Sequence, residues 1–108
     1  MRLPERTDRL ILVPFDKAEG TDLSCAAKTA GKSVGTVRNW CVQEGIGRRI
    51  GNGAWVVSKV ALAMFLDGDQ AALDAYHSGD RESSLVTSYF ERVGVRAPAS
   101  KASKSSNL

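Results

Sequence analysis

The sequence predicts a mainly helical fold with one small β-hairpin near its middle and further helices after it. Three observations lead to this fold class. Apolar residues recur at helical spacing in short segments separated by glycine. The triplet Gly51-Asn52-Gly53 stands between two β-prone runs, and more helical stripes follow it. A chain of 108 residues is long enough for one small domain with appended pieces.

Two short helices joined by a tight turn are predicted between residues 21 and 45. Thr21 is expected to cap the first helix and Gly31 to end it, because glycine readily adopts the left-handed conformation that closes a helix. Ser33 is expected to cap the second helix, which Gly45 ends. The stripe of this second helix expected to face the core is Val34, Val37, Trp40 and Cys41.

The hydrophobic period changes to that of a strand after Gly45. Runs at residues 46–50 and 54–57 flank the glycine triplet and predict a basic hairpin that carries Arg48 and Arg49. Ser58 then caps another helix, with Val60, Ala61, Met64 and Phe65 on its apolar face. A helix-turn-helix followed directly by a hairpin is the winged helix-turn-helix arrangement, and we assign it to residues 21–67.

The remaining residues are expected to be appended to this unit. Residues 1–20 predict an arm with a short strand at Leu10–Val13, which either joins the sheet of the hairpin or packs elsewhere. Residues 68–94 predict a helical extension, with one helix that Asp69 caps and that runs through Tyr76, and an amphipathic helix from Glu82 to Val93. The apolar face of that last helix is Leu85, Val86, Tyr89, Phe90 and Val93. Residues 95–108 predict a disordered tail rich in alanine, serine and lysine.

The charge is distributed unevenly along the chain. The formal net charge is +3. Residues 21–60 contain six basic and two acidic side chains, a net charge of +4, whereas residues 61–93 contain two basic and six acidic ones, a net charge of −4. A basic segment beside an acidic one indicates one face for a polyanion and another part that faces elsewhere.

The reactive residues do not form a recognisable catalytic or metal-binding set. His77 is the only histidine and lies in a turn-like stretch, where we expect it to be solvated. Cys25 and Cys41 are 16 residues apart with no histidine near them, so we expect two reduced thiols packed on inner helix stripes and no bound zinc. We expect neither an enzyme nor a cofactor.

The beginning of the chain and its hydropathy bear on location. Residues 1–15 lack the long apolar core of a signal peptide, and no apolar run reaches the roughly 20 residues that span a membrane. We therefore expect a cytoplasmic protein.

Residues 21–67 resemble the winged-helix DNA-binding domain of the excisionase family, a relative of the MerR regulators. The matching features are the Ala26-Ala27 pair, the Gly31-Lys32-Ser33 turn, Val37 and Trp40, the glycine-containing wing, and Ser58 opening a helix with Leu62 and Phe65. The resemblance implies a small DNA-binding protein of bacteria, phages or mobile elements, associated with the nucleoid. The long dimerisation helix of MerR-type sensors has no counterpart here, so a drug or metal sensor is not expected.

Candidate DNA contacts follow from the helix-turn-helix, in which the second helix lies in the major groove and its first residues reach base edges. Arg38 would bond a guanine or, as the MerR resemblance favours, a backbone phosphate, and Asn39 would bond an adenine. Ser33 and Thr36 would bond phosphate, and Gly35 would permit close approach. Gln43 faces outward beside Asn39, and both are either base contacts or plain solvated surface. The remaining candidates are Lys28 and Lys32 around the turn, and Arg48, Arg49 and Asn52 on the wing.

The expected function is sequence-specific binding of double-stranded DNA in the manner of an excisionase, with bending of the duplex. Such a protein directs a recombinase or influences RNA polymerase, as a homodimer or as cooperating monomers. Alternatives are a phage small-terminase-like DNA-recognition subunit and a protein-interaction module that reuses the winged helix without DNA. We expect only one of Arg48 and Arg49 to touch DNA, since neighbouring residues on a strand face opposite ways.

Overall fold

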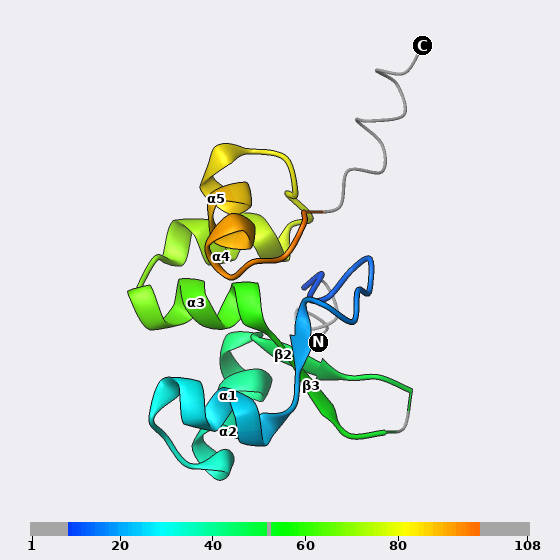
Figure 1. Cartoon of the computed structure of the whole chain (residues 1–108), viewed down its shortest axis with the longest axis vertical. Helices are drawn as coiled ribbons and strands as arrows, with labels where there is room; N and C mark the ends of the chain where they lie inside the picture. Colours follow the sequence, from blue (N-terminus) through cyan, green and yellow to red (C-terminus); the bar gives the residue numbers. More distant parts are fainter. Residues whose placement is uncertain (1–8, 52, 98–108) are drawn as a thin grey trace, which may run out of the picture.

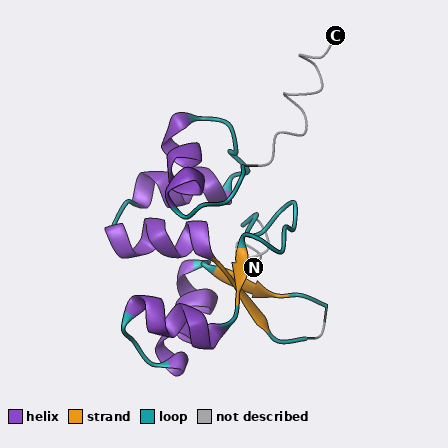
Figure 2. Cartoon of the chain, viewed as in Figure 1, coloured by secondary structure: helices purple, strands orange, loops and turns teal. Residues whose placement is uncertain are grey.

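Five helices and three short strands follow one another in the part of the chain that the computed structural model describes, residues 9–51 and 53–97. Figures 1 and 2 show the helices in two groups with α3 between them and the small sheet at one side. The elements are β1 (Gly20–Thr21), α1 (Leu23–Ala30), α2 (Val34–Glu44), β2 (Gly47–Arg49), β3 (Trp55–Ser58), α3 (Lys59–Asp67), α4 (Gln70–His77) and α5 (Ser84–Arg92). The prediction of a mainly helical chain with a small hairpin is confirmed.

Short polar side chains begin most of the helices. Ser33, Ser58 and Asp69 each accept a hydrogen bond from the backbone N–H three residues on, as the sequence predicts. For α1 the prediction of Thr21 is wrong, because Asp22 caps the helix through a 2.7 Å bond from the Cys25 N–H. Thr21 lies in β1 instead and pairs with Val57.

The sheet is antiparallel, with β3 between β1 and β2. Arg48 of β2 lies opposite Val56, and Gly20 of β1 lies opposite Ser58. The strand predicted at Leu10–Val13 is wrong. That segment forms a turn, with Ile11 and Leu12 buried in the core. The carbonyls of both residues accept hydrogen bonds from the Arg48 side chain instead of from a neighbouring strand. Gly20–Thr21 occupies the third place in the sheet.

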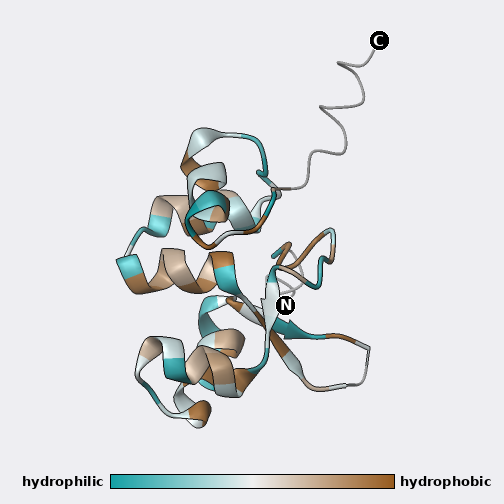
Figure 3. Cartoon of the chain, in the orientation of Figure 1, coloured by the Kyte–Doolittle hydropathy of each residue, from teal (hydrophilic) through white to brown (hydrophobic). Residues whose placement is uncertain are grey.

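The apolar core is centred on α3, which packs against both helix groups (Figure 3). Val60, Ala61 and Met64 are fully buried, as predicted for this helix. Three other predicted core positions are wrong. Val34 and Leu85 are each 41% exposed, and Cys25 is exposed. Val34 and Leu85 lie in the first turns of their helices, and Cys25 precedes the Ala26-Ala27 pair that turns toward the core, so no neighbouring element covers these three side chains.

The C-terminal helices follow the prediction except at their ends. α5 begins at Ser84 instead of Glu82, because the Asp80 carboxylate accepts hydrogen bonds from the backbone N–H groups of Glu82 and Ser83 and holds both in a turn. These bonds also hold the pKa of Asp80 below its usual value. Val95 is buried, so the tail predicted from residue 95 packs on the core at its start, and residues 98–108 lie outside the described residues.

One buried polar cluster joins the arm, the sheet and the C-terminal helices. Glu19, which is 1% exposed, accepts hydrogen bonds at Oε2 from the hydroxyls of Ser58 and Tyr76. The Tyr76 hydroxyl also accepts a 2.8 Å bond from the backbone N–H of Leu12. Burial and the Glu19 carboxylate raise the pKa of Tyr76, so its hydroxyl stays protonated as a donor.

Arg81 fixes the same region from outside the cluster. Its guanidinium lies 3.9 Å from the centre of the Tyr76 ring, a cation–π contact. It also donates to the backbone carbonyls of Leu10 and Tyr76. The arm is therefore bound to α4 and to the loop that follows it by two sets of contacts, both of which include Tyr76.

Removal of the Tyr76 hydroxyl should destabilise the whole fold. In Tyr76→Phe the Leu12 N–H and the Glu19 carboxylate each lose a buried partner, and we expect the free energy of unfolding in urea to fall by about 1–3 kcal/mol. Tyr89→Phe is the matched control, because the Tyr89 hydroxyl bonds Asp67 and Asp69 near the surface and should cost about 1 kcal/mol or less. Equal losses of unfolding free energy in the two variants would show that the buried cluster stabilises the fold no more than hydrogen bonds near the surface do.

Candidate nucleic-acid interface

The turn between α1 and α2 presents two lysines to solvent. Lys28 in the last turn of α1 and Lys32 in the turn are both exposed. Gly31 closes α1 with φ of 70°, the left-handed conformation that favours glycine. Its N–H and that of Lys32 bond the carbonyls at the end of α1, which fixes the path of the chain into α2. Both lysines lie where the sequence prediction puts them.

The first turn of α2 is polar and sterically open. The Ser33 hydroxyl accepts a 3.1 Å bond from the Thr36 N–H and lies 2.9 Å from the Thr36 hydroxyl. A Cβ added at Gly35 would meet only the Ser33 Oγ, at 4.0 Å. The fold itself therefore does not need glycine at this position. A nucleic-acid backbone that approached this turn would meet two hydroxyls and the helix N-terminus. No side chain at Gly35 would stand in its way.

The solvent face of α2 carries the predicted polar residues and two apolar ones that the sequence prediction missed. Arg38, Asn39 and Gln43 are exposed, as expected. Val34 and Val42 are each 41% exposed on the same helix. The spacing of Val34, Arg38 and Val42, four residues apart, could have revealed this, since such residues share one helix face. The face thus combines a cation, two amides and two branched aliphatic groups.

The two arginines of the hairpin have different surroundings. Arg48 donates from Nε to the Ile11 carbonyl at 2.8 Å and from Nη2 to the Leu12 carbonyl at 3.2 Å, so it binds the arm. Arg49 is exposed and donates from Nε to the Gly53 carbonyl at 3.1 Å, which orients it along the hairpin. Asn52, the third predicted wing contact, lies outside the described residues.

Charge separates along the molecule. Glu44 is the only acidic residue from 23 to 66. The acidic side chains Asp67, Asp69, Asp74, Asp80, Glu82 and Glu91 belong to the end of α3 and to the segment of α4 and α5. Figure 1 shows α4 and α5 at the opposite end of the molecule from α1 and α2. The six acidic residues from 67 to 91 are therefore remote from the start of α2, and the helix pair itself has only Asp22 at the beginning of α1 and Glu44 at the end of α2.

The C-terminal end of α2 is held by side chains from outside the helix pair. His77 Nε2 lies 2.8 Å from the carbonyl oxygen of Gly45, and Arg9 donates from Nη1 to the Gln43 carbonyl at 3.2 Å. The last carbonyls of a helix have no partner within the helix, so these contacts satisfy them. The expectation of a solvated His77 is wrong, since the ring is half-buried against α2.

The cysteines and possible metal ligands offer no second site. Cys25 is exposed, and burial raises the pKa of the Cys41 thiol to about 11, so Cys41 stays protonated at neutral pH. Among the described residues, no group of three or more His, Cys, Asp or Glu side chains could hold a metal ion. Nor does any helix in the described ranges have the length and apolar character to cross a membrane.

Comparison of the chain with protein-family models, with curated proteins and with solved structures found no match.

His77 should titrate below the ordinary histidine pKa of 6.5. Burial is the largest cause, and the nearby Arg9 and Arg81 act in the same direction, whereas the Gly45 carbonyl and Asp74 oppose it. Because the unfolded chain binds this proton more readily, the folded state should lose stability as the pH falls through 6.5 and below. An NMR titration of the only histidine measures its pKa directly.

The matching stability measurement compares the native chain with His77→Gln. Between about pH 7.5 and about pH 5.5 the native chain should lose more thermal stability than the variant, since glutamine does not titrate. A His77 pKa at or above 6.5, together with equal losses of thermal stability in both proteins, would contradict the prediction that burial lowers this pKa.

Proposed function

We propose that this chain is a sequence-specific double-stranded DNA-binding protein with a winged helix-turn-helix at residues 21–67, of the excisionase type. The observation that carries the proposal is the exposure of polar and basic residues around the start of α2. Ser33 and Gly35 at the helix N-terminus are exposed, and the exposed cations Lys28, Lys32 and Arg38 lie on the same segment of two helices and a turn. Anions bind at helix N-termini because the backbone N–H groups there carry partial positive charge.

Two sets of residues would contact different parts of the DNA. Lys28, Lys32, Ser33 and Thr36 bond phosphates and fix the protein on the duplex, while Asn39, Gln43 and the two exposed valines meet base edges in the major groove. Arg38 either reads a guanine or bonds a phosphate. On the wing, Arg49 contacts the flanking backbone, and Arg48 does not, because its guanidinium is bonded to the arm.

The biological setting follows from the resemblance to excisionases. We propose a cytoplasmic protein that bends DNA and directs a recombinase, or that regulates transcription through RNA polymerase. It would act as cooperating monomers or a homodimer. The interaction module without DNA is less well supported, since Val86, Tyr89 and Phe90 of the apolar α5 face are buried in the core. No observation on this chain favours the terminase-like role.

DNA affinity should depend steeply on salt. Each phosphate contact contributes about −0.9 to the slope of log K against log salt concentration, so four contacts predict a slope of about −4. Gel shifts or fluorescence anisotropy with duplexes from around its own gene and with random duplex provide the measurement. A slope near zero, with no binding to either duplex, would remove DNA binding as the function.

Arg38→Ala separates the two roles left open for this residue. If Arg38 bonds a phosphate, the salt slope should become less steep by about 1 with little change in sequence preference. If it reads a guanine, discrimination at one base pair should fall by about 1–3 kcal/mol. The control is Arg96→Ala, an exposed arginine beyond α5 that should change neither quantity. Identical behaviour of the two variants would remove Arg38 from the interface.

Gly35→Ala tests close approach of DNA to the helix. The free protein has room for the methyl group, so the variant should be more stable by about 0.5–1 kcal/mol, the helix preference for alanine over glycine. Its DNA affinity should nevertheless fall, because the methyl group meets the DNA backbone. Unchanged affinity in a stabilised variant would show that DNA does not come close to Gly35.

A further inference from the structure

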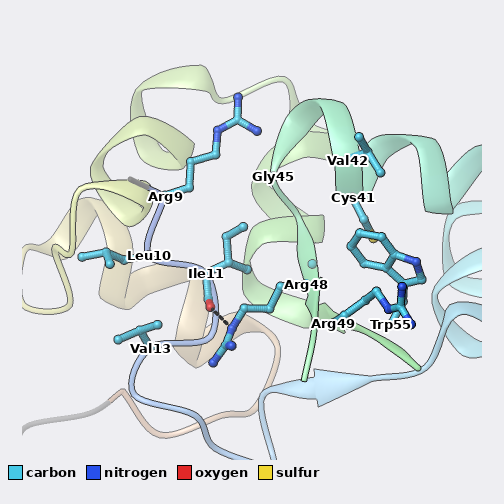
Figure 4. Close-up of a pocket in the computed structure, with 11 residues that line it drawn as sticks. Arg9, Leu10, Ile11, Val13, Cys41, Val42, Gly45, Arg48, Arg49 and Trp55 are labelled. Atoms are coloured by element: carbon cyan, nitrogen blue, oxygen red, sulfur yellow. Dashed lines mark hydrogen bonds between the residues drawn. The ribbon is translucent and has the colours of Figure 1, made fainter. Parts of the chain in front are cut away.

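A cleft of about 590 Å³ lies between the arm, the end of α2 and the hairpin, away from the start of α2. Figure 4 shows Arg9, Leu10, Ile11 and Val13 of the arm on one side, Val42, Cys41 and Trp55 on the other, and Arg48 between them. α2 has 11 residues, so its C-terminal end is about 16 Å from the turn proposed to meet DNA. The cleft is therefore a surface separate from the helix N-terminus.

The charged side chains that the structure places along this cleft are basic, and Arg9 also borders a neighbouring hollow that contains Glu44 and Asp74. Its charged lining residues are Arg9, Arg48 and Arg49, and no carboxylate lines it among the described residues. Arg48 is part-buried, and both of its hydrogen bonds go to neutral backbone carbonyls. A guanidinium has five N–H donors, so Arg48 keeps donors for a carboxylate from outside. Such a charge-assisted bond is stronger than one to a neutral acceptor.

The walls of the cleft are apolar and exposed. Leu10 and Val13 of the arm are 37% and 40% exposed, and Val42 on the opposite wall is 41% exposed. Trp55 is half-buried at the hairpin side, and Ile11 is buried. A nucleic-acid backbone has no aliphatic side groups to cover these walls. An occupant that carries both carboxylates and aliphatic side chains fits the lining better than a phosphate chain does.

We propose that this cleft binds a short acidic segment of a partner protein, in which an aspartate or glutamate side chain bonds Arg48 and neighbouring aliphatic side chains contact Val13, Val42 and Trp55. The segment would lie beside β2, which is an outer strand of the sheet. The arm forms one wall of the cleft, which gives residues 9–13 a role beyond packing. The proposal does not depend on DNA binding.

The test uses the full chain labelled with ¹⁵N and ¹³C and a short synthetic peptide in which aspartate and leucine alternate. We expect shifts of the Val13 and Val42 methyl signals and of the Trp55 indole signal, with weak but saturable binding. Two matched peptides separate the causes: in one serine replaces leucine, and in the other lysine replaces aspartate. Both should bind at least about ten-fold more weakly, since each lacks one of the two required groups.

Variants locate the site and keep the proposal separate from DNA binding. Val13→Asp places a carboxylate on an exposed wall, at a residue outside the proposed DNA contacts, and should weaken peptide binding at least about ten-fold through repulsion. Leu85→Asp is the control, because Leu85 is also 41% exposed but lies on α5 outside the cleft.

Three outcomes would overturn the proposal. The first is the absence of shifts at cleft residues, and the second is equal weakening by Leu85→Asp. The third is displacement of the peptide by duplex DNA together with loss of DNA affinity in Val13→Asp, which would assign the cleft to DNA. DNA binding that survives Val13→Asp while peptide binding is lost supports the proposal. A chain that binds the peptide but not DNA would support it too, and would refute only the proposed function.

Discussion

The buried carboxylate of Glu19 is the point at which three distant parts of the chain meet. Transfer of a charged group out of water is costly unless hydrogen bonds replace the lost solvation, and here two hydroxyls do so. The Ser58 hydroxyl donates to Glu19 and also accepts from the Ala61 N–H, so it starts α3 and binds the arm at once. Tyr76 connects α4 to the same cluster, and its hydroxyl accepts a hydrogen bond from the Leu12 N–H. The sheet, α3 and the C-terminal helices therefore share one set of partners.

The candidate interface depends on this cluster only indirectly. α2 does not contribute to the cluster, and its end is held by His77 of α4 and Arg9 of the arm, which the cluster and Arg81 keep in place. The C-terminal helices thus have a positioning role for α2, a role that the resemblance to a minimal winged helix did not supply. A perturbation of Tyr76 should consequently reach α2 through its C-terminal end, while the start of α2 depends on the local bonds of Ser33.

Local signals in the sequence predicted the ends of most helices, and distant contacts explain what they missed. Ser33, Ser58 and Asp69 were predictable because a capping bond spans only three residues. The burial of Glu19 was not, because its partners Ser58 and Tyr76 are 39 and 57 positions away. In the candidate site, the exposure of Lys28 and Arg38 followed from helical spacing, and that of Lys32 from its place in the turn. The engagement of Arg48 by the arm did not, since it joins residues 36 and 37 positions apart.

The charged side chains at the two ends of the molecule differ in whether they have partners within the fold. Asp69 caps α4, Asp80 shapes the turn before α5, and Asp67 bonds Tyr89 and Arg92, so these three acidic residues have structural partners. In the described part of the chain, the side chains of Lys28, Lys32 and Arg38 form no hydrogen bond or ion pair. The net charge of +3 is too small to indicate a polyanion by itself. Lys28, Lys32 and Arg38 are thus three exposed cations that lie close together around the start of α2, and this local excess would attract an external anion.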